Sequence, residues 1–124
     1  MKYVEFKDFV GKTFRSVTVN DDKTEILFVT DDGRTFRMFH FRDCCEWVEV
    51  EDINGELDWL VGSPVLTAEE SESQKPPAGA EKKDDSDTWT FYRISTEKGM
   101  VVIRWHGSSN GYYSESVDIV EVSK

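Results

Sequence analysis

The segment from Arg104 to Ser114 contains the residues best suited to hold a ligand. On a strand, Arg104 and His106 alternate with Ile103 and Trp105, so the two cationic side chains point away from the apolar face. The turn-rich residues that follow offer hydroxyls, an amide, backbone N–H groups and two aromatic rings. An arginine fork can hold phosphate oxygens and a tyrosine ring can stack on a base, so we predict a site for a small anionic, nucleotide-type ligand. The predicted ligand-binding residues are Arg104, His106, Ser109, Asn110, Tyr112 and Tyr113.

The same segment also has a purely structural interpretation. It can be a hairpin loop whose tyrosines close one end of a β-sandwich. Other arginines on predicted strands could converge on the ligand site, or they could form ion pairs with the excess of acidic residues. These arginines are Arg15, Arg37, Arg42 and Arg93.

The acidic residues support a second hypothesis. The chain of 124 residues has 25 Asp and Glu against 15 Lys and Arg, a formal net charge of -10. This charge opposes binding to nucleic acid or to an anionic membrane, because both need clustered basic residues. Acidic side chains could instead mimic phosphates and block the basic groove of a host enzyme that acts on nucleic acid, as an inhibitor of the DNA-mimic or anti-CRISPR type, or they could serve solubility alone. The predicted acidic face consists of Glu49, Glu51, Asp52, Glu69 and Glu70.

The sequence contains no catalytic motif. A nucleophilic enzyme needs Ser, Cys or Thr beside a base, and His40 and His106 are the only histidines. The Gly-x-Ser-x-Gly motif and the Gly-rich phosphate loop are both absent. An acidic magnesium site stays open, but pairs such as Glu51-Asp52 are typical of a solvated surface. We therefore expect a binding protein that is not an enzyme and has no cofactor.

The adjacent Cys44 and Cys45 are expected to be reduced. Neighbours on an extended chain point to opposite faces, so a disulfide between them needs a strained turn. Together with His40, Asp43 and Glu46 they could form a zinc site, but the spacing matches no zinc module built from paired Cys-x-x-Cys or His-x-x-x-His elements. Free cysteines are more commonly buried small hydrophobic residues, and we expect no metal.

Alternation of apolar and polar residues with period two dominates the chain and predicts an all-β, mainly antiparallel fold. We expect a small β-sandwich or a curved, partly closed sheet of about eight short strands with one or two short helical turns, as a single domain over 1–124. Residues 71–87 have no large apolar side chain and are expected to form a flexible acidic loop rich in Pro, Gly and Ser. Strands are predicted at 13–19, 24–30, 34–41, 46–52, 65–70, 88–95, 100–106 and 112–122, and helical turns at 5–10 and 56–61.

Four segments carry a family resemblance. They are His40-x-x-Asp-Cys-Cys-Glu46, the Gly-Ser-Pro segment at 62–70, Thr-Trp-Thr-Phe-Tyr at 88–92 and the segment 104–114. Together they resemble a family of small uncharacterised proteins carried by bacteriophages and prophages, and the likeness extends over nearly the whole chain. The resemblance implies an accessory role in an infected cell, chiefly in blocking host defence, but it implies no mechanism.

Location and partners follow from the same observations. No apolar stretch approaches the roughly 20 residues of a membrane-spanning helix, and residues 1–5 lack the apolar run of a signal peptide. We therefore expect a cytoplasmic protein of the infected bacterial cell. The preferred hypothesis is sequestration of a nucleotide-type immune signal, and a homo-oligomer is one way to supply more cationic donors to the pocket. The alternative is inhibition of a basic host defence protein by the acidic face.

Overall fold

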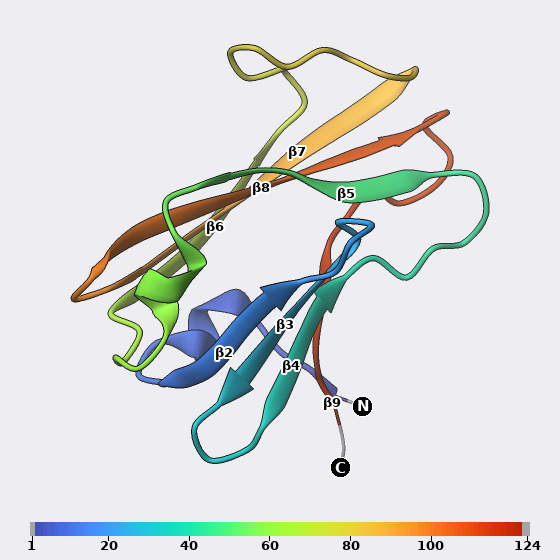
Figure 1. Cartoon of the computed structure of the whole chain (residues 1–124). Helices are drawn as coiled ribbons and strands as arrows, with labels where there is room; N and C mark the ends of the chain where they lie inside the picture. Colours follow the sequence, from blue (N-terminus) through green and yellow to red (C-terminus); the bar gives the residue numbers. More distant parts are fainter. Residues whose placement is uncertain (1, 123–124) are drawn as a thin grey trace.

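The computed structural model describes residues 2–122 and consists mainly of β-strands (Figure 1). The strands are β1 (Lys2–Tyr3), β2 (Phe14–Val19), β3 (Glu25–Thr30), β4 (Thr35–Phe39), β5 (Trp47–Asn54), β6 (Thr67–Ser73), β7 (Ser86–Thr96), β8 (Gly99–Ser109) and β9 (Asp118–Val122). Two 3-10 turns, η1 (Phe6–Phe9) and η2 (Leu57–Leu60), lie where the sequence predicts helical turns. The predicted all-β class is confirmed.

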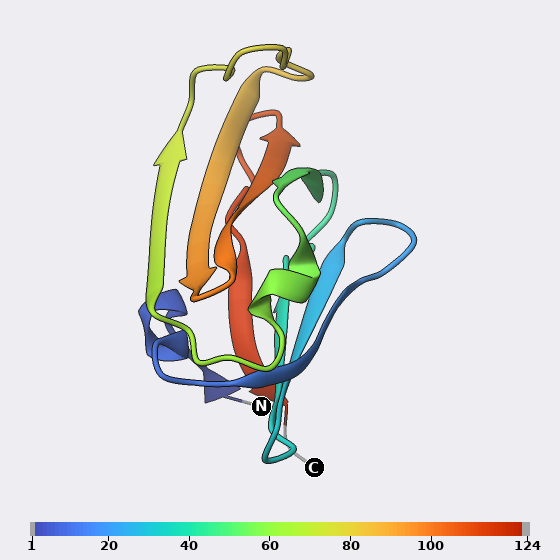
Figure 2. The same ribbon diagram turned by 60° about the vertical axis from the view of Figure 1, so that its left-hand side comes forward.

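Two antiparallel sheets form the layers of a sandwich (Figure 2). The five-stranded sheet has the order β1-β9-β4-β3-β2, and the four-stranded sheet has the order β5-β8-β7-β6. The long strands β7 and β8 pair from Ser86↔Ser109 to Thr96↔Gly99 and form the centre of the four-stranded sheet. Their β-branched and aromatic residues favour such a central position.

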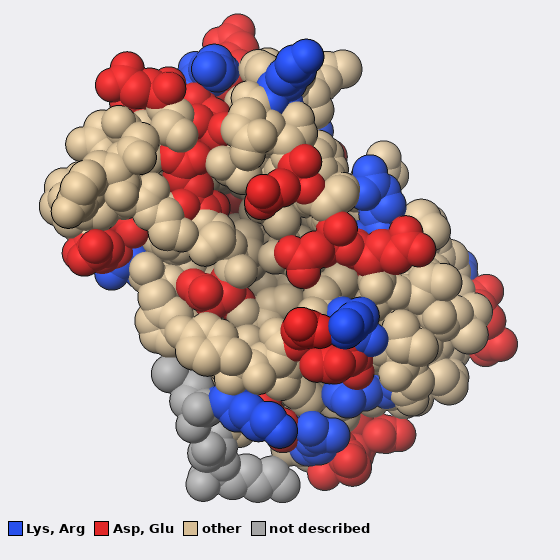
Figure 3. All heavy atoms as spheres, turned by 180° about the vertical axis from the view of Figure 1, so that it is seen from behind, with Lys and Arg blue, Asp and Glu red and all other residues tan. Residues whose placement is uncertain are grey.

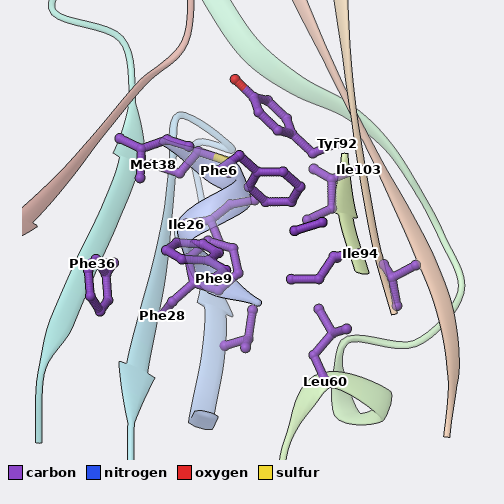
Figure 4. Close-up of a cluster of buried hydrophobic side chains, with 14 of the residues drawn as sticks. Phe6, Phe9, Ile26, Phe28, Phe36, Met38, Leu60, Tyr92, Ile94 and Ile103 are labelled. Atoms are coloured by element: carbon purple, nitrogen blue, oxygen red, sulfur yellow. The ribbon is translucent and has the colours of Figure 1, made fainter. Parts of the chain in front are cut away.

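The core lies between the two sheets and is rich in phenylalanine (Figure 4). The short turn η1 inserts Phe6 and Phe9 between the layers, and both rings are almost fully buried. The Phe9 ring centroid lies 5.0 Å from that of Phe28 on one sheet, and Phe6 lies 4.8 Å from Tyr92 on the other. Through these contacts η1 belongs to the core and joins the two layers. Replacement of either phenylalanine by alanine should therefore destabilise the fold by about 3–5 kcal/mol.

Two strands differ from the sequence prediction. β6 runs from Thr67 to Ser73, where 65–70 is predicted, because its polar second half pairs in register with β7 through the backbone. The stretch without strand structure therefore covers residues 74–85 rather than 71–87. At the other end of the chain, β9 begins only at Asp118, because residues 110–117 form an irregular loop instead of the predicted strand.

Candidate functional site

The four-stranded sheet separates the predicted ligand-binding residues into two groups. Ile103 and Trp105 on β8 are buried in the core between the sheets, so Arg104 and His106 lie on the outer face, as the alternation predicts. Ser109, four residues after Trp105, lies on the inner side of the sheet and is fully buried. The cationic and the hydroxyl-bearing residues of the predicted site therefore do not face a common space.

On the outer face, Arg104 and His106 bind carboxylates of the chain itself. Arg104 Nε donates to Glu51 Oε1 at 2.8 Å, and His106 Nδ1 lies 3.0 Å from Glu51 Oε2. His106 Nε2 lies 2.6 Å from Asp87 Oδ1. Each ring nitrogen thus faces a carboxylate oxygen, and Nε2 is hydrogen-bonded to Asp87. The arginine and the histidine meet two carboxylates in a compact group, in which the Arg104 guanidinium forms an ion pair with Glu51.

Trp89 completes this group, which we call the Asp87–His106 cluster: Glu51, Asp87, Trp89, Arg104 and His106. The indole ring stacks on the His106 ring with centroids 4.5 Å apart and planes 9° apart, and its Nε1 donates to Glu51 Oε1 at 3.1 Å. Trp89 and His106 are directly opposite each other in the β7–β8 register. The sequence analysis did not include Trp89 and Asp87 in the site. The alternation along β7 could have indicated them, because it places both side chains on the same outer face as His106.

Asp87 also fixes the loop that precedes β7. Its carboxylate accepts the backbone N–H of Lys83 at 3.0 Å and of Asp84 at 3.4 Å. Burial acts to raise the pKa of Asp87, but the hydrogen bonds from Lys83 and His106 outweigh it and lower the pKa. The carboxylate is thus held ionised by donors on two sides, and it connects the end of the 74–85 loop to the sheet.

On the inner side, the loop after β8 folds around Glu115. The Glu115 carboxylate accepts hydrogen bonds from Ser109 Oγ and from Thr88 Oγ1, the latter at 2.8 Å. Gly107 permits this arrangement, because a Cβ atom there would lie 2.6 Å from the Glu115 carbonyl oxygen. Of the remaining predicted residues, Asn110 is exposed and accepts the Tyr112 backbone N–H, while Tyr112 is 83% exposed.

Beside this loop lies a cavity of about 280 Å³. Tyr113 and Gly111 line it from the loop, and Thr88 lines it from β7. Its charged lining residues are Glu72 and Glu115, and no lysine or arginine among residues 2–122 lines it. A cavity with this lining is suited to hydroxyl or cationic groups of a ligand better than to phosphate.

The other arginines do not converge on the predicted site. Arg37 pairs with Glu25 on the five-stranded sheet, Arg93 donates to Ser71 Oγ at 2.9 Å, and Arg42 lies over the Trp47 ring at 5.4 Å. Arg15 is exposed on β2.

The predicted acidic face is divided between three environments. Glu51 belongs to the Asp87–His106 cluster, and Glu49 forms an ion pair with Lys83 at 3.2 Å. Asp52 is exposed on β5. Glu69 and Glu70 lie on β6, at the edge of the sheet.

The edge strand β6 carries acidic residues that have no cationic partner within residues 2–122. Glu69, Glu70 and Glu72 are exposed and form no ion pair with the described lysines, arginines or histidines. Partial burial raises the pKa of Glu70, and the neighbouring charges of Glu72 and Glu5 raise it further. No ion pair of the described residues therefore engages these three carboxylates, although Arg93 lies opposite Glu69 in the β6–β7 register.

A hollow of about 460 Å³ lies beside the start of this edge. Phe6 and Ala68 supply apolar lining, Glu69 and Glu70 supply carboxylates, and Glu5 and Lys7, which form an ion pair at 3.0 Å, complete the lining. Lysine and arginine side chains combine an apolar stem with a cationic head, and this hollow offers surface for both parts.

A second histidine–carboxylate pair organises the chain before β5. His40 Nε2 lies 2.8 Å from Glu46 Oε2, and His40 Nδ1 lies 2.7 Å from the Ser116 carbonyl oxygen. Glu46 is fully buried and accepts the backbone N–H groups of Asp43 and Cys44 at 2.8 and 2.9 Å. Burial acts to raise the pKa of Glu46, but the hydrogen bonds from Asp43, His40 and Cys44 outweigh it and lower the pKa to about 2. The sequence analysis considered the motif His-x-x-Asp-Cys-Cys-Glu only as a candidate metal site. In the structure, the histidine and the backbone of this motif instead bind the Glu46 carboxylate.

Cys44 and Cys45 form a disulfide between adjacent residues, and the expectation of two thiols is therefore corrected. That expectation assumed an extended chain. The structure instead has a bend at these two residues, where the Cys44 N–H turns toward Glu46. Both cysteines are exposed, so they are not the buried hydrophobic residues that the sequence suggested.

Within the described chain there is no group of three His, Cys, Asp or Glu side chains arranged to hold a metal ion. The same residues include no helix with the length and apolar character needed to cross a membrane.

Comparison with known proteins gives the family but no activity. No curated protein and no solved structure matches the chain. Residues 7–119, which include both sheets except β1 and residues 120–122 of β9, match the model of a domain of unknown function, DUF7448, and the chain belongs to this family.

Proposed function

We propose that the protein is a non-enzymatic binding protein that attaches to a basic surface of a partner protein through the edge strand β6. The observation that carries this proposal is the uncompensated negative charge of Glu69, Glu70 and Glu72 on an unpaired sheet edge. The pKa of Glu70 is raised by partial burial and then by the charges of Glu72 and Glu5, and an arriving lysine or arginine would stabilise its ionised form. Figure 3 shows acidic side chains in several separate groups on one face of the molecule, with lysine and arginine side chains between some of them.

The mode of binding follows from the strand. β6 is hydrogen-bonded to β7 on one side only, so its other side presents backbone N–H and C=O groups. An extended segment of the partner can add to such an edge as a further strand. The hollow lined by Phe6, Ala68 and Glu70 would receive one basic side chain of that segment.

The wider role is part of the same proposal. We propose that the partner is a host enzyme that acts on nucleic acid, since such enzymes present lysine and arginine in their substrate grooves. Occupation of the groove would block the enzyme, which is the task of a counter-defence protein. The origin in a phage or prophage, implied by the family resemblance of the sequence, belongs to this proposal.

A peptide-binding experiment tests the docking site. The probe is an extended peptide of about twelve residues that alternates lysine and threonine, with a glutamate–threonine peptide of the same length as control, and the measurement is isothermal titration calorimetry at about 50 to about 300 mM salt. We expect binding of the basic peptide only, weakening as salt increases. The double variant Glu69→Gln/Glu70→Gln should bind at least about tenfold more weakly, which is about 1.4 kcal/mol.

The matched control is Asp21→Asn/Asp22→Asn, which removes the same charge from an exposed turn between β2 and β3. If both double variants weaken binding equally, the attraction is diffuse and β6 is not the docking site. Absence of binding to the basic peptide at low salt would overturn the proposal altogether.

Sequestration of a small anionic ligand is a second proposal. The cavity beside Tyr113 supports it by its size, but the Glu72 and Glu115 lining and the engagement of Arg104 with Glu51 do not favour phosphate. Thermal unfolding in the presence of linear and cyclic nucleotides tests it, because a ligand at 100 times its dissociation constant adds about 2.7 kcal/mol of stability. A lack of any shift would reject it.

A further inference from the structure

A cavity of about 220 Å³ lies next to the start of β5 and differs in charge from the other cavities of the chain. Thr24 lines it from the turn between β2 and β3, His40 and Arg42 from the segment after β4, and Trp47 and Val48 from β5. No Asp or Glu among residues 2–122 lines it, whereas three other cavities each have at least two. In a chain with a net charge of -10, this cavity therefore combines an arginine with the absence of a lining carboxylate.

Hydrogen bonds fix the walls of this cavity. The Val50 N–H donates to the Lys23 carbonyl oxygen at 2.7 Å and so joins the β2–β3 turn to β5. The His40 side chain is only 5% exposed, with one ring nitrogen 2.7 Å from the Ser116 carbonyl oxygen and the other 2.8 Å from Glu46 Oε2. A preformed cavity requires little ordering of the chain when a ligand binds, which favours affinity.

Arg42 supplies a cation that the chain itself does not neutralise. Arg34, Arg37 and Arg104 form ion pairs with glutamates, whereas Arg42 forms none with the carboxylates of residues 2–122. Its guanidinium instead lies 5.4 Å from the centroid of the Trp47 ring, and this large side chain remains 42% exposed. An arginine fork binds carboxylate or phosphate oxygens, and an aromatic ring packs against another flat ring. The two neighbours can therefore bind the two parts of one ligand.

We infer that this cavity, which we call the Arg42–Trp47 cavity, binds a small planar anion: a single aromatic ring that carries a carboxylate or a phosphate group. The anionic group binds the Arg42 guanidinium, and the ring stacks on the Trp47 indole. Thr24 Oγ1 accepts a hydrogen bond from Asn20 Nδ2 at 2.9 Å, which leaves its own hydroxyl proton to donate to an oxygen of the ligand.

The volume of the cavity limits the size of the ligand. Pockets for drug-sized ligands span about 300–1,000 Å³, and this cavity of about 220 Å³ is smaller. It therefore takes one ring with its anionic group rather than the base, sugar and phosphates of a nucleotide. The inference is independent of docking by β6, and it shares only the charge of the ligand with nucleotide sequestration, which concerns the cavity beside Tyr113.

Four small probes test the ring and the charge separately. Benzoate and phenyl phosphate carry both features, benzamide has the ring without the charge, and cyclohexanecarboxylate has the charge without the flat ring. The measurement is a ¹H–¹⁵N NMR titration that follows the Trp47 indole N–H and the Val48 backbone amide. We expect benzoate or phenyl phosphate to shift both signals with a dissociation constant below about 5 mM, and benzamide and cyclohexanecarboxylate to bind at least about tenfold more weakly. The tighter of the two anions identifies the preferred anionic group.

The variants Arg42→Gln and Trp47→Leu remove the charge and the ring in turn. Both side chains are exposed, so the midpoint of thermal unfolding should stay close to that of the original protein. Each variant should bind the preferred anion at least about tenfold more weakly, followed at the Val48 amide. If Trp47→Leu lowers the midpoint, Trp47→Phe replaces it, because phenylalanine keeps a smaller ring at the same place.

The matched control is Arg15→Gln, which removes an exposed arginine on β2 that does not line the cavity. This variant should bind the anion like the original protein. Unchanged signals of Trp47 and Val48 with both anions at about 20 mM would overturn the inference. Binding that Arg42→Gln retains, or that Arg15→Gln weakens equally, would overturn it as well.

Discussion

The substitution Asp87→Asn tests whether the Asp87–His106 cluster stabilises the fold. Asparagine keeps the shape of the side chain but removes the charge that faces His106 Nε2 at 2.6 Å. It also offers one oxygen where the carboxylate offers two, so the N–H groups of Lys83 and Asp84 cannot both be satisfied as before. The group is nearly inaccessible to solvent, with Asp87 and His106 each 2% exposed.

The expected magnitude follows from this burial. The buried Asp87 carboxylate accepts hydrogen bonds from Lys83, Asp84 and His106, and a hydrogen bond to a charged group contributes about 1.5–3 kcal/mol. We expect a total loss of about 3 kcal/mol, because the asparagine oxygen can still accept part of these hydrogen bonds. For a chain of this size the midpoint of thermal unfolding should fall by about 10 °C.

The assay is urea unfolding followed by tryptophan fluorescence, at pH 7 and at a series of lower pH values. The lowered pKa of Asp87 means that its contribution is complete above the ordinary carboxyl pKa of about 4 and is lost as the pH falls through the folded-state pKa. The difference between the original protein and Asp87→Asn should therefore shrink below about pH 4. Asp85→Asn, an exposed change of the same kind on the same loop, should shift stability by less than about 0.5 kcal/mol. Equal effects of the two substitutions at pH 7 would refute the reasoning.

Two further predictions concern the segments next to the cluster. Glu46→Gln should destabilise the protein at pH 7 and make the acid limb of its stability curve shallower, because the Glu46 pKa of about 2 stabilises the fold above about pH 4 and this contribution disappears as the pH falls toward 2. Carboxyl NMR titration should assign a midpoint near 2 to Glu46 in the original protein, and a midpoint near 4 would contradict the hydrogen bonds with His40. Gly107→Ala should cost about 1–3 kcal/mol, because the new Cβ atom would lie 2.6 Å from the Glu115 carbonyl oxygen. Urea unfolding measures this cost. An unchanged midpoint would contradict the prediction, because it would show that the loop at Glu115 shifts to accommodate the methyl group without loss of stability.

Most of the fold was predictable from alternation along the chain. The β2–β3 hairpin, the central pair β7–β8 and the two 3-10 turns all appear where apolar periodicity and glycine predict them. The second half of β6 was not predictable, because Ser71 to Ser73 have no apolar pattern and are ordered by backbone pairing with β7. Backbone pairing depends on the neighbouring strand, which local sequence does not reveal.

The predicted site was harder to derive than the fold. Alternation correctly placed Arg104 and His106 on the outer face, but it carried no information on which carboxylates would meet them. Ser109 was assigned to the same pocket because it is near in sequence, whereas the strand continues far enough to place it on the inner side.

The register shift between Val50 and Asp52 in β5 predicts which residues should change together among members of the family. Val50 pairs with Trp105 and Asp52 pairs with Arg104, so Glu51 is an extra residue in the strand. Its carboxylate nevertheless accepts hydrogen bonds from Arg104 and Trp89 and lies 3.0 Å from His106 Nδ1. A relative that lost this one residue would regain a regular strand but would leave the arginine and the tryptophan without their acceptor and the histidine without this carboxylate neighbour. We therefore expect a gap at this position in an alignment to coincide with replacement of the arginine, the histidine and the tryptophan, so that all four residues are gained or lost together.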